Sequence, residues 1–223
     1  MYRLPLLLGL LTTVAGCARP RLGGNPGPGE LPVPAGMSAQ VWHHALTAYA
    51  RVKDEGVPVR PVLAVIDYSL PSSEPRLWVT DLNTGALLLN DYVAHGWASG
   101  GTWPTRFSNR RGSNQSSLGA FVAGEAYVGV RGLSLRLSGL EPGINDRARE
   151  RGIVIHGSPS VSSRRAGEGN VGRTEGCPAV PMPSARTVVR LLEGGGLVYA
   201  WYPDPAFLAT SRYLSPLAWA GSP

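Results

Sequence analysis

Apolar positions recur with a helical period in one early segment of the chain. Within residues 38–53 they follow the i, i+3, i+4, i+7 spacing of an amphipathic helix. The positions concerned are Trp42, Ala45, Leu46 and Tyr49. Ser38 is suited to cap the amino end of this helix, and Gly56 is suited to end it. The pattern therefore predicts one helix at the start of a folded domain.

Shorter apolar runs, bounded by glycine, proline and asparagine, dominate the rest of the chain. Runs of this length that are rich in β-branched residues predict strands. The predicted strands cover residues 61–68, 77–82, 86–93, 121–130, 133–140, 152–157 and 197–202. Residues 83–85 and Gly132 are suited to the turns of two hairpins, and residues 184–193 predict a second helix. The chain is therefore predicted to be mainly β with a few helices, in one domain over residues 37–223.

Two segments precede this domain. Residues 18–36 are rich in proline and glycine and show no periodicity, which predicts a semi-flexible tether. Residues 4–14 are mostly apolar, a stretch too short to span a bilayer and typical of a signal peptide. The sequence from Val14 to Cys17 resembles a bacterial lipobox, so residues 1–17 are expected to be a lipoprotein signal with Cys17 as the lipidated residue. An ordinary secretory signal cut near Ala15 is the alternative.

The charge of the chain favours an anionic partner. Lys and Arg number 21 against 15 Asp and Glu, a net charge of +6, which suits a membrane surface or an acidic cell-wall polymer. No basic run exceeds two residues, so a nucleic-acid partner is not expected.

Cysteine and histidine supply the candidate chemistry. If Cys17 carries lipid, Cys177 is left as a free thiol, and a reactive thiol is a better explanation than a Cys17–Cys177 disulfide. His156 and His95 each stand before a glycine at the end of a predicted strand, where an imidazole can activate a thiol. Gly176 would let backbone N–H groups approach a developing oxyanion. A zinc site of both histidines and Cys177 lacks the usual spacing, so no metal or cofactor is expected.

Several motifs together resemble one enzyme family. The pair HG at 156–157 and TEGC at 174–177 resembles the YkuD-type L,D-transpeptidases. Further stretches resemble the murein L,D-transpeptidase catalytic domain subfamily: YVAHG (92–96), FSN (107–109), SSLGAF (116–121), SLRLSGLEPGIN (134–145), ARERGIVIHG (148–157) and GCPAVP (176–181). The resemblance runs in order over residues 60–202 and implies a mixed sheet that forms an open barrel.

The resemblance also implies the roles of the central residues. Cys177 would be the nucleophile that forms a thioester with a peptidoglycan stem peptide. His156 would hold the thiol proton as imidazolium, and the backbone carbonyl of Gly157 would orient the imidazole. The N–H groups of Gly176 and Cys177 would form the oxyanion hole.

Other residues are assigned to the cleft by the same resemblance. The substrate-binding candidates are His95, Ser116, Ser117, Gly119, Arg173 and Thr174, with His95 equally compatible with a structural role. Ala179 departs from the family, which commonly has an arginine there, so the cation of the donor site is missing unless Arg173 replaces it. Arg110, Arg111 and Arg131 could meet carboxylates of a diaminopimelate-type stem, although a solvated surface is the favoured reading of each.

The resemblance implies a monomeric enzyme that faces the periplasm, is anchored by lipid and binds peptidoglycan stem peptides. It would transfer the acyl group to an amine by L,D-transpeptidation. The alternatives are hydrolysis of the same thioester, as an L,D-carboxypeptidase or endopeptidase, and a silent cell-wall-binding lipoprotein. Ala18, which stands where an inner-membrane retention signal would place aspartate, favours the outer membrane.

Overall fold

The computed structural model describes residues 31–169 and 171–214. The expected signal segment, Cys17 and most of the expected tether lie outside these residues. The last part of that tether packs on the domain, since Leu31 is buried and the indole N–H groups of Trp42 and Trp78 donate to the carbonyls of Leu31 and Ala35. The packed domain therefore begins earlier than residue 37.

The first predicted helix is confirmed as α1, Ala39–Asp54. Its apolar face is buried, and Trp42 and Ala45 are completely inaccessible to solvent. The helix ends before Gly56, whose φ of 75° is a left-handed conformation that suits glycine. Ser38 stands at the amino end, but its side chain makes no capping hydrogen bond.

Eight strands form one mixed sheet. They are β1 Val62–Asp67, β2 Leu77–Asp81, β3 Leu87–Asp91, β4 Gly119–Gly129, β5 Gly132–Gly139, β6 Val154–Ser158, β7 Ala179–Pro181 and β8 Leu197–Trp201. Their order is β3-β2-β1-β8-β4-β5-β6-β7. The pairs β1–β8 and β6–β7 are parallel, and the other neighbours are antiparallel. All seven predicted strands are present; β7 is too short to give a pattern.

The two edges of the sheet meet beside the candidate cysteine. Ala94, just after the edge strand β3, forms an antiparallel bridge with Ala179 of the other edge strand, β7. Gly96 forms a second bridge with Thr174. These bridges nearly close the sheet into the expected open barrel, and the segment that closes it carries Cys177.

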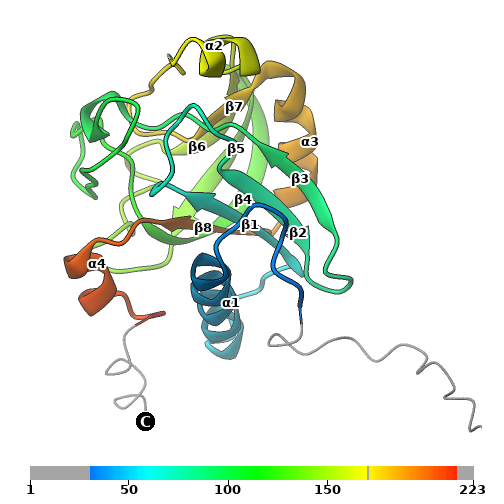
Figure 1. Cartoon of the computed structure of the whole chain (residues 1–223). Helices are drawn as coiled ribbons and strands as arrows, with labels where there is room; N and C mark the ends of the chain where they lie inside the picture. The colour runs from blue at the N-terminus through cyan, green and yellow to red at the C-terminus, as the bar shows by residue number, and fades with distance from the viewer. Residues whose placement is uncertain (1–30, 170, 215–223) are drawn as a thin grey trace, which may run out of the picture.

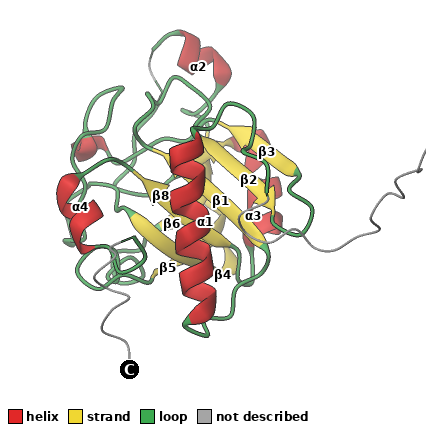
Figure 2. Cartoon of the chain, turned by 60° about the horizontal axis from the view of Figure 1, so that its bottom comes forward, coloured by secondary structure: helices red, strands yellow, loops and turns green. Residues whose placement is uncertain are grey.

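Helices cover the sheet from different sides. Figure 2 shows α1 across the front of the strands and α3, Met182–Leu192, behind them. The remaining helices are short: η1 Trp97–Ser99, α2 Ser163–Gly167 and α4 Pro205–Thr210. In Figure 1, α2 lies at the end of the molecule opposite α1. None of the helices in the described ranges has both the length and the apolar character needed to cross a membrane.

Candidate active site

Cys177 lies at a small cleft between a hairpin and the strand that carries His156. The cleft has a volume of about 130 Å³. Its lining comprises Tyr127, Val130, Arg131, Ser134, Arg151, Gly152, Val154, Glu175 and Cys177. The Cys177 side chain is partly buried, and its Sγ lies 3.6 Å from the carbonyl oxygen of Gly152. The thiol is therefore reachable from a pocket yet sheltered from bulk water.

Burial raises the pKa of the Cys177 thiol above its ordinary value. The backbone N–H of Val154 and the guanidinium groups of Arg131 and Arg151 act in the opposite direction, while the carboxylate of Glu175 adds to the rise in pKa. Desolvation is the largest effect, so the resting cysteine is a neutral thiol at neutral pH.

His156 presents one ring nitrogen for proton transfer. It is buried on β6, and its Nδ1 lies 2.9 Å from the carbonyl oxygen of Gly157, the contact expected from the sequence. Because a carbonyl only accepts, Nδ1 carries the proton and Nε2 is left as an acceptor. Nε2 is buried and has no hydrogen-bond partner in the structure. Burial also lowers the pKa of His156, so the resting imidazole is neutral.

The strand register brings the histidine and the cysteine segment together. β6 and β7 are parallel neighbours, and His156 is paired with Ala179, two residues after Cys177. Ala179 is completely buried and also bridges Ala94. A methyl side chain fits this position, whereas the arginine common in the family would need to bury a guanidinium there.

The turn at Cys177 is braced by Thr174. The Thr174 hydroxyl donates to the Cys177 carbonyl at 2.6 Å and accepts from the Gly176 N–H at 3.1 Å. Gly176 has φ 124°, and a Cβ there would approach the Gln115 carbonyl oxygen to 2.8 Å, so only glycine fits. The expected oxyanion donor at Gly176 is thus occupied in this structure, which leaves the Cys177 N–H as the candidate donor. Thr174 positions Cys177 and is itself buried.

The serines and the glycine that were expected in the cleft wall lie next to the residues of the site and not in the cleft lining. Ser116 and Ser117 are buried, and the Ser116 hydroxyl donates to the Gly176 carbonyl at 3.1 Å. Gly119 has φ 93°, and a Cβ there would lie 2.2 Å from the Glu141 carboxylate. These three residues support the site through contacts with Gly176, Arg151 and Glu141, and none of them lines the cleft.

Arg151 is a functional residue that the sequence reasoning missed. One guanidinium nitrogen donates to the Ser108 carbonyl at 2.5 Å and the Ser117 hydroxyl at 2.6 Å. The other donates to the Gln115 carbonyl at 2.6 Å and the Ser113 hydroxyl at 3.2 Å. Arg151 therefore fixes the 108–117 loop against the Cys177 turn. It lies within the stretch ARERGIVIHG (148–157), but that stretch does not predict the contacts that Arg151 makes with the loop.

His95 occupies a structural position. Its side chain is completely buried, its Nδ1 lies 2.8 Å from a guanidinium nitrogen of Arg76, and its Nε2 lies 3.5 Å from the carbonyl oxygen of Gly100. Burial, reinforced by the Arg76 charge, lowers the pKa of His95 to about 4, so it stays neutral. Its backbone carbonyl accepts from the Thr174 N–H at 2.9 Å. Of the two roles open to His95, substrate contact does not fit this burial, and support of the cysteine segment does.

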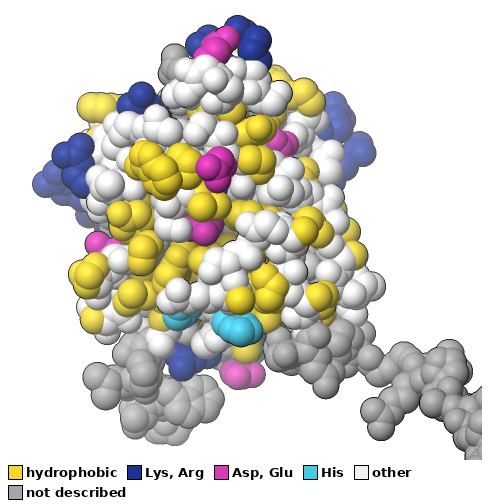
Figure 3. Space-filling view, in the orientation of Figure 1, with side chains coloured by type: hydrophobic (Ala, Val, Ile, Leu, Met, Phe, Trp, Pro, Cys, Tyr) yellow, Lys and Arg dark blue, Asp and Glu magenta, His cyan; other side chains and the backbone are white. Residues whose placement is uncertain are grey.

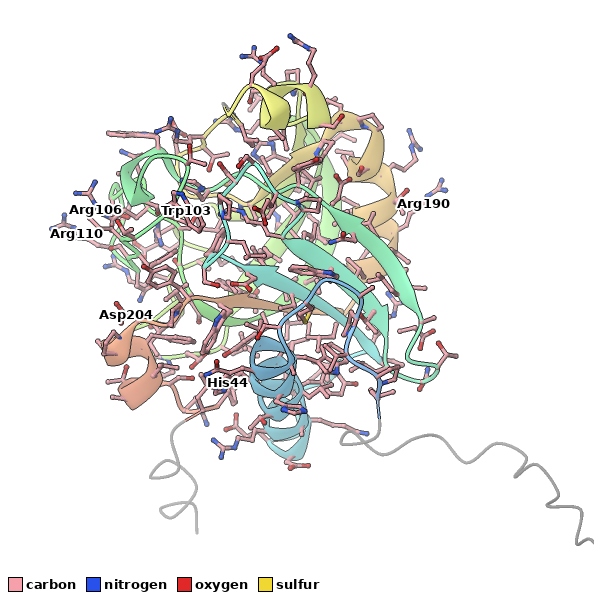
Figure 4. All side chains as sticks on the ribbon, in the orientation of Figure 1. His44, Trp103, Arg106, Arg110, Arg190 and Asp204 are labelled. Carbon is pink, nitrogen blue, oxygen red and sulfur yellow. The ribbon has the colours of Figure 1, made fainter. Side chains whose placement is uncertain are left out.

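Of the four candidate arginines, Arg131 lines the Cys177 cleft and the other three lie outside it. Arg173 is exposed and donates to the Gly100 carbonyl at 3.1 Å. Arg110 and Arg111 are exposed and are not part of the cleft lining. In Figure 4, Arg110 projects from the side of the molecule near Arg106. Figure 3 shows Lys and Arg side chains mainly along the edges of one face, with no continuous basic patch across it.

Solved structures with a similar fold include L,D-transpeptidases and a cell shape determining protein. An L,D-transpeptidase from Mycobacterium smegmatis is 13% identical, with a TM-score of 0.40, over 64% of this chain and 59% of that one. Bd1075 from Bdellovibrio bacteriovorus is 14% identical, with a TM-score of 0.40 and coverage of 64% and 48%. The helical cell shape determining protein Pgp2 from Campylobacter jejuni is 12% identical, with a TM-score of 0.39 and coverage of 64% and 48%. The chain thus spans about half to three fifths of these proteins.

Sequence comparison identifies a family for the chain but no individual curated relative. No curated protein matches the chain significantly. The family model of the L,D-transpeptidase catalytic domain matches residues 34–201. Because this match covers well over half of the sequence, the chain belongs to the family of L,D-transpeptidase catalytic domains.

Proposed function

We propose that the protein is a cysteine-dependent L,D-transpeptidase that acts on peptidoglycan stem peptides through a thioester at Cys177. The observation that carries the proposal is the buried, unpartnered Nε2 of His156, on the strand that pairs with the Cys177 segment. A buried polar atom without a partner is costly, and such atoms are expected where a proton must be taken up. Membership of the family supports the same reading.

The neutral pair defines the first half of the reaction. As Sγ of Cys177 attacks the peptide carbonyl carbon, its proton passes to Nε2 of His156 and a carbon–sulfur bond forms. The carbonyl oxygen becomes an oxyanion, which the Cys177 N–H can receive. The carbon–nitrogen bond then breaks, and the imidazolium returns the proton to the leaving amine. A thioester and a neutral His156 remain.

The second half repeats these steps with another nucleophile. An amine of a neighbouring stem attacks the thioester carbon and gives a proton to Nε2, and the released Cys177 sulfur recovers that proton. Attack by water instead of an amine would make the protein a carboxypeptidase or endopeptidase. The same residues serve both outcomes, so access of the acceptor decides between them.

The proposal is tested on the full chain with defined muropeptides, with and without an added amine acceptor. Mass spectrometry is expected to show an acyl adduct on the protein and an amine-linked product, both absent from the Cys177→Ala variant. If the product forms only by attack of water, the protein is a hydrolase and not a transferase. A wild-type chain that forms no adduct with a carbapenem and turns over no muropeptide would leave only a cell-wall-binding role.

We also propose that the chain is a lipoprotein that faces the periplasm, with the outer membrane as the favoured destination. The lipobox-like sequence before Cys17 supports this, together with the proline- and glycine-rich residues that follow it. Labelled palmitate is expected on the wild-type chain and not on Cys17→Ala. Equal labelling of the two chains would contradict the anchor, with Cys177→Ala as the matched cysteine control.

A further inference from the structure

Three charged side chains line the cleft that contains Cys177: Arg131, Arg151 and Glu175. A peptide with an ionised carboxylate needs a cation there, because burying an unpaired charge is costly. The four hydrogen bonds of Arg151 to the 108–117 loop engage both of its terminal nitrogens. Arg151 is therefore committed to the protein's own structure, and Arg131 is the cation of the cleft that a ligand can reach.

Arg131 lies at the tip of the hairpin that joins β4 and β5. Gly129 pairs with Gly132, so Val130 and Arg131 are the two residues of the turn. A guanidinium nitrogen of Arg131 lies 3.5 Å from a carboxylate oxygen of Glu175, which is two residues before Cys177. The side chains are 48% and 72% exposed, respectively. An ion pair this exposed contributes little and exchanges readily, so a ligand carboxylate can displace Glu175.

We propose that Arg131 is the residue that recognises a carboxylate of the donor peptide, and that Glu175 occupies Arg131 while the cleft is empty. This inference rests on the proposed function for the identity of the donor. The guanidinium fork suits a carboxylate in two-point contact, and the hairpin tip sets it on the same cleft as the sulfur. Ala179 is buried in the sheet, so the position where the family commonly has arginine offers no cation here.

Two alkylating reagents of nearly equal size test the site without requiring turnover. Iodoacetate carries a carboxylate and iodoacetamide does not, and both react with the same thiolate. The ratio of their rates at Cys177, measured on the full chain by mass spectrometry of the peptide that contains Cys177, therefore cancels any change in the pKa of the thiol. Arg131→Gln is expected to lower the iodoacetate-to-iodoacetamide ratio about fivefold, the order expected for one exposed charge pair.

Companion variants separate recognition from general effects of charge. Glu175→Gln is expected to raise the iodoacetate-to-iodoacetamide ratio, and Arg131→Lys is expected to keep most of the wild-type ratio. Arg164→Gln is the matched control, since Arg164 lies on α2, forms an exposed ion pair with Glu168 and does not line the cleft. This control should leave the ratio unchanged. An Arg131→Gln variant that slows both reagents equally, or loses no more than Arg164→Gln, would overturn the inference.

Donor peptides supply the second arm. With stems amidated at each carboxylate in turn, Arg131→Gln is expected to raise KM for the free acid about fivefold and to leave KM unchanged for one amidated form. KM values that Arg131→Gln does not change for any stem would overturn the inference. If no stem is turned over by the wild-type chain, the proposed function fails, and the alkylation ratio still decides the role of Arg131.

Discussion

Replacing His156 by glutamine is expected to slow formation of the Cys177 acyl adduct about a thousandfold. Glutamine can keep a hydrogen bond to the Gly157 carbonyl, which His156 makes at 2.9 Å, but its amide cannot accept the thiol proton. The thiol pKa is raised by burial, so little thiolate is present at neutral pH without a base. The rate is measured from the intact mass of the full chain after mixing with a carbapenem.

The pH dependence of the acylation rate follows from the shifted pKa values of Cys177 and His156. Burial lowers the pKa of His156, so its basic form persists to a lower pH than in an ordinary histidine. The acid limb of the acylation rate is therefore expected below about pH 6.5, the ordinary histidine value. His43→Gln, a change on the exposed side of α1, should leave rate and limb unchanged. An acid limb of the acylation rate above about pH 6.5 would contradict general-base activation by His156. An acylation rate that His156→Gln does not lower would contradict it as well.

Local sequence was enough to single out Cys177 and His156 as the candidate pair but not to predict the contacts of their neighbours. His156 and His95 share the same pattern, an apolar strand that ends in His-Gly. They differ because Arg76, 19 residues before His95, packs against the ring of His95, whereas Nε2 of His156 has no partner. Contacts between residues far apart in sequence decided which imidazole is available.

The turn residues show the same limit. Thr174 and Gly176 were identified as site residues from their motif, yet their roles depend on the geometry of the turn. The hydroxyl of Thr174 occupies the Gly176 N–H, which a list of residue types cannot reveal. Arg151 and Glu175 lie within stretches that carry the resemblance, but no role was predicted for either, and only the fold shows that both line the cleft.

The same limit applies to the fold: its local elements could be predicted from the sequence, and its long-range strand pairings could not. Hairpins such as β4–β5 were predicted because their turns and alternation are local. The parallel pairing of β1 with β8 joins the first and last strands, and the Ala94–Ala179 bridge joins positions 85 apart. Neither pairing leaves a periodic signal, and α2 and α4 are too short to show one.

Replacing Arg76 by methionine is expected to lower the free energy of unfolding by about 4 kcal/mol. Arg76 is completely buried, and burial lowers its pKa only to about 10, so it is charged at neutral pH. Its guanidinium donates to the carbonyls of Leu70 and Val93 at 2.8 to 3.1 Å and contacts Nδ1 of His95. Methionine would fill much of the volume but would leave these acceptors unpaired in the interior.

The loss is measured by urea denaturation of the full chain at pH 7, with Arg60→Met as the matched control. Arg60 also donates to two carbonyls, of Leu191 and Glu193, but it is exposed, so water can replace it and the expected loss is below about 1 kcal/mol. Arg76 holds Val93 and His95, and the His95 carbonyl holds Thr174, which braces Cys177. Acylation of the folded Arg76→Met variant should therefore also slow. Equal losses of stability in the two variants would contradict the expected effect of burying Arg76. An unchanged acylation rate in Arg76→Met would contradict its role in bracing the cysteine turn.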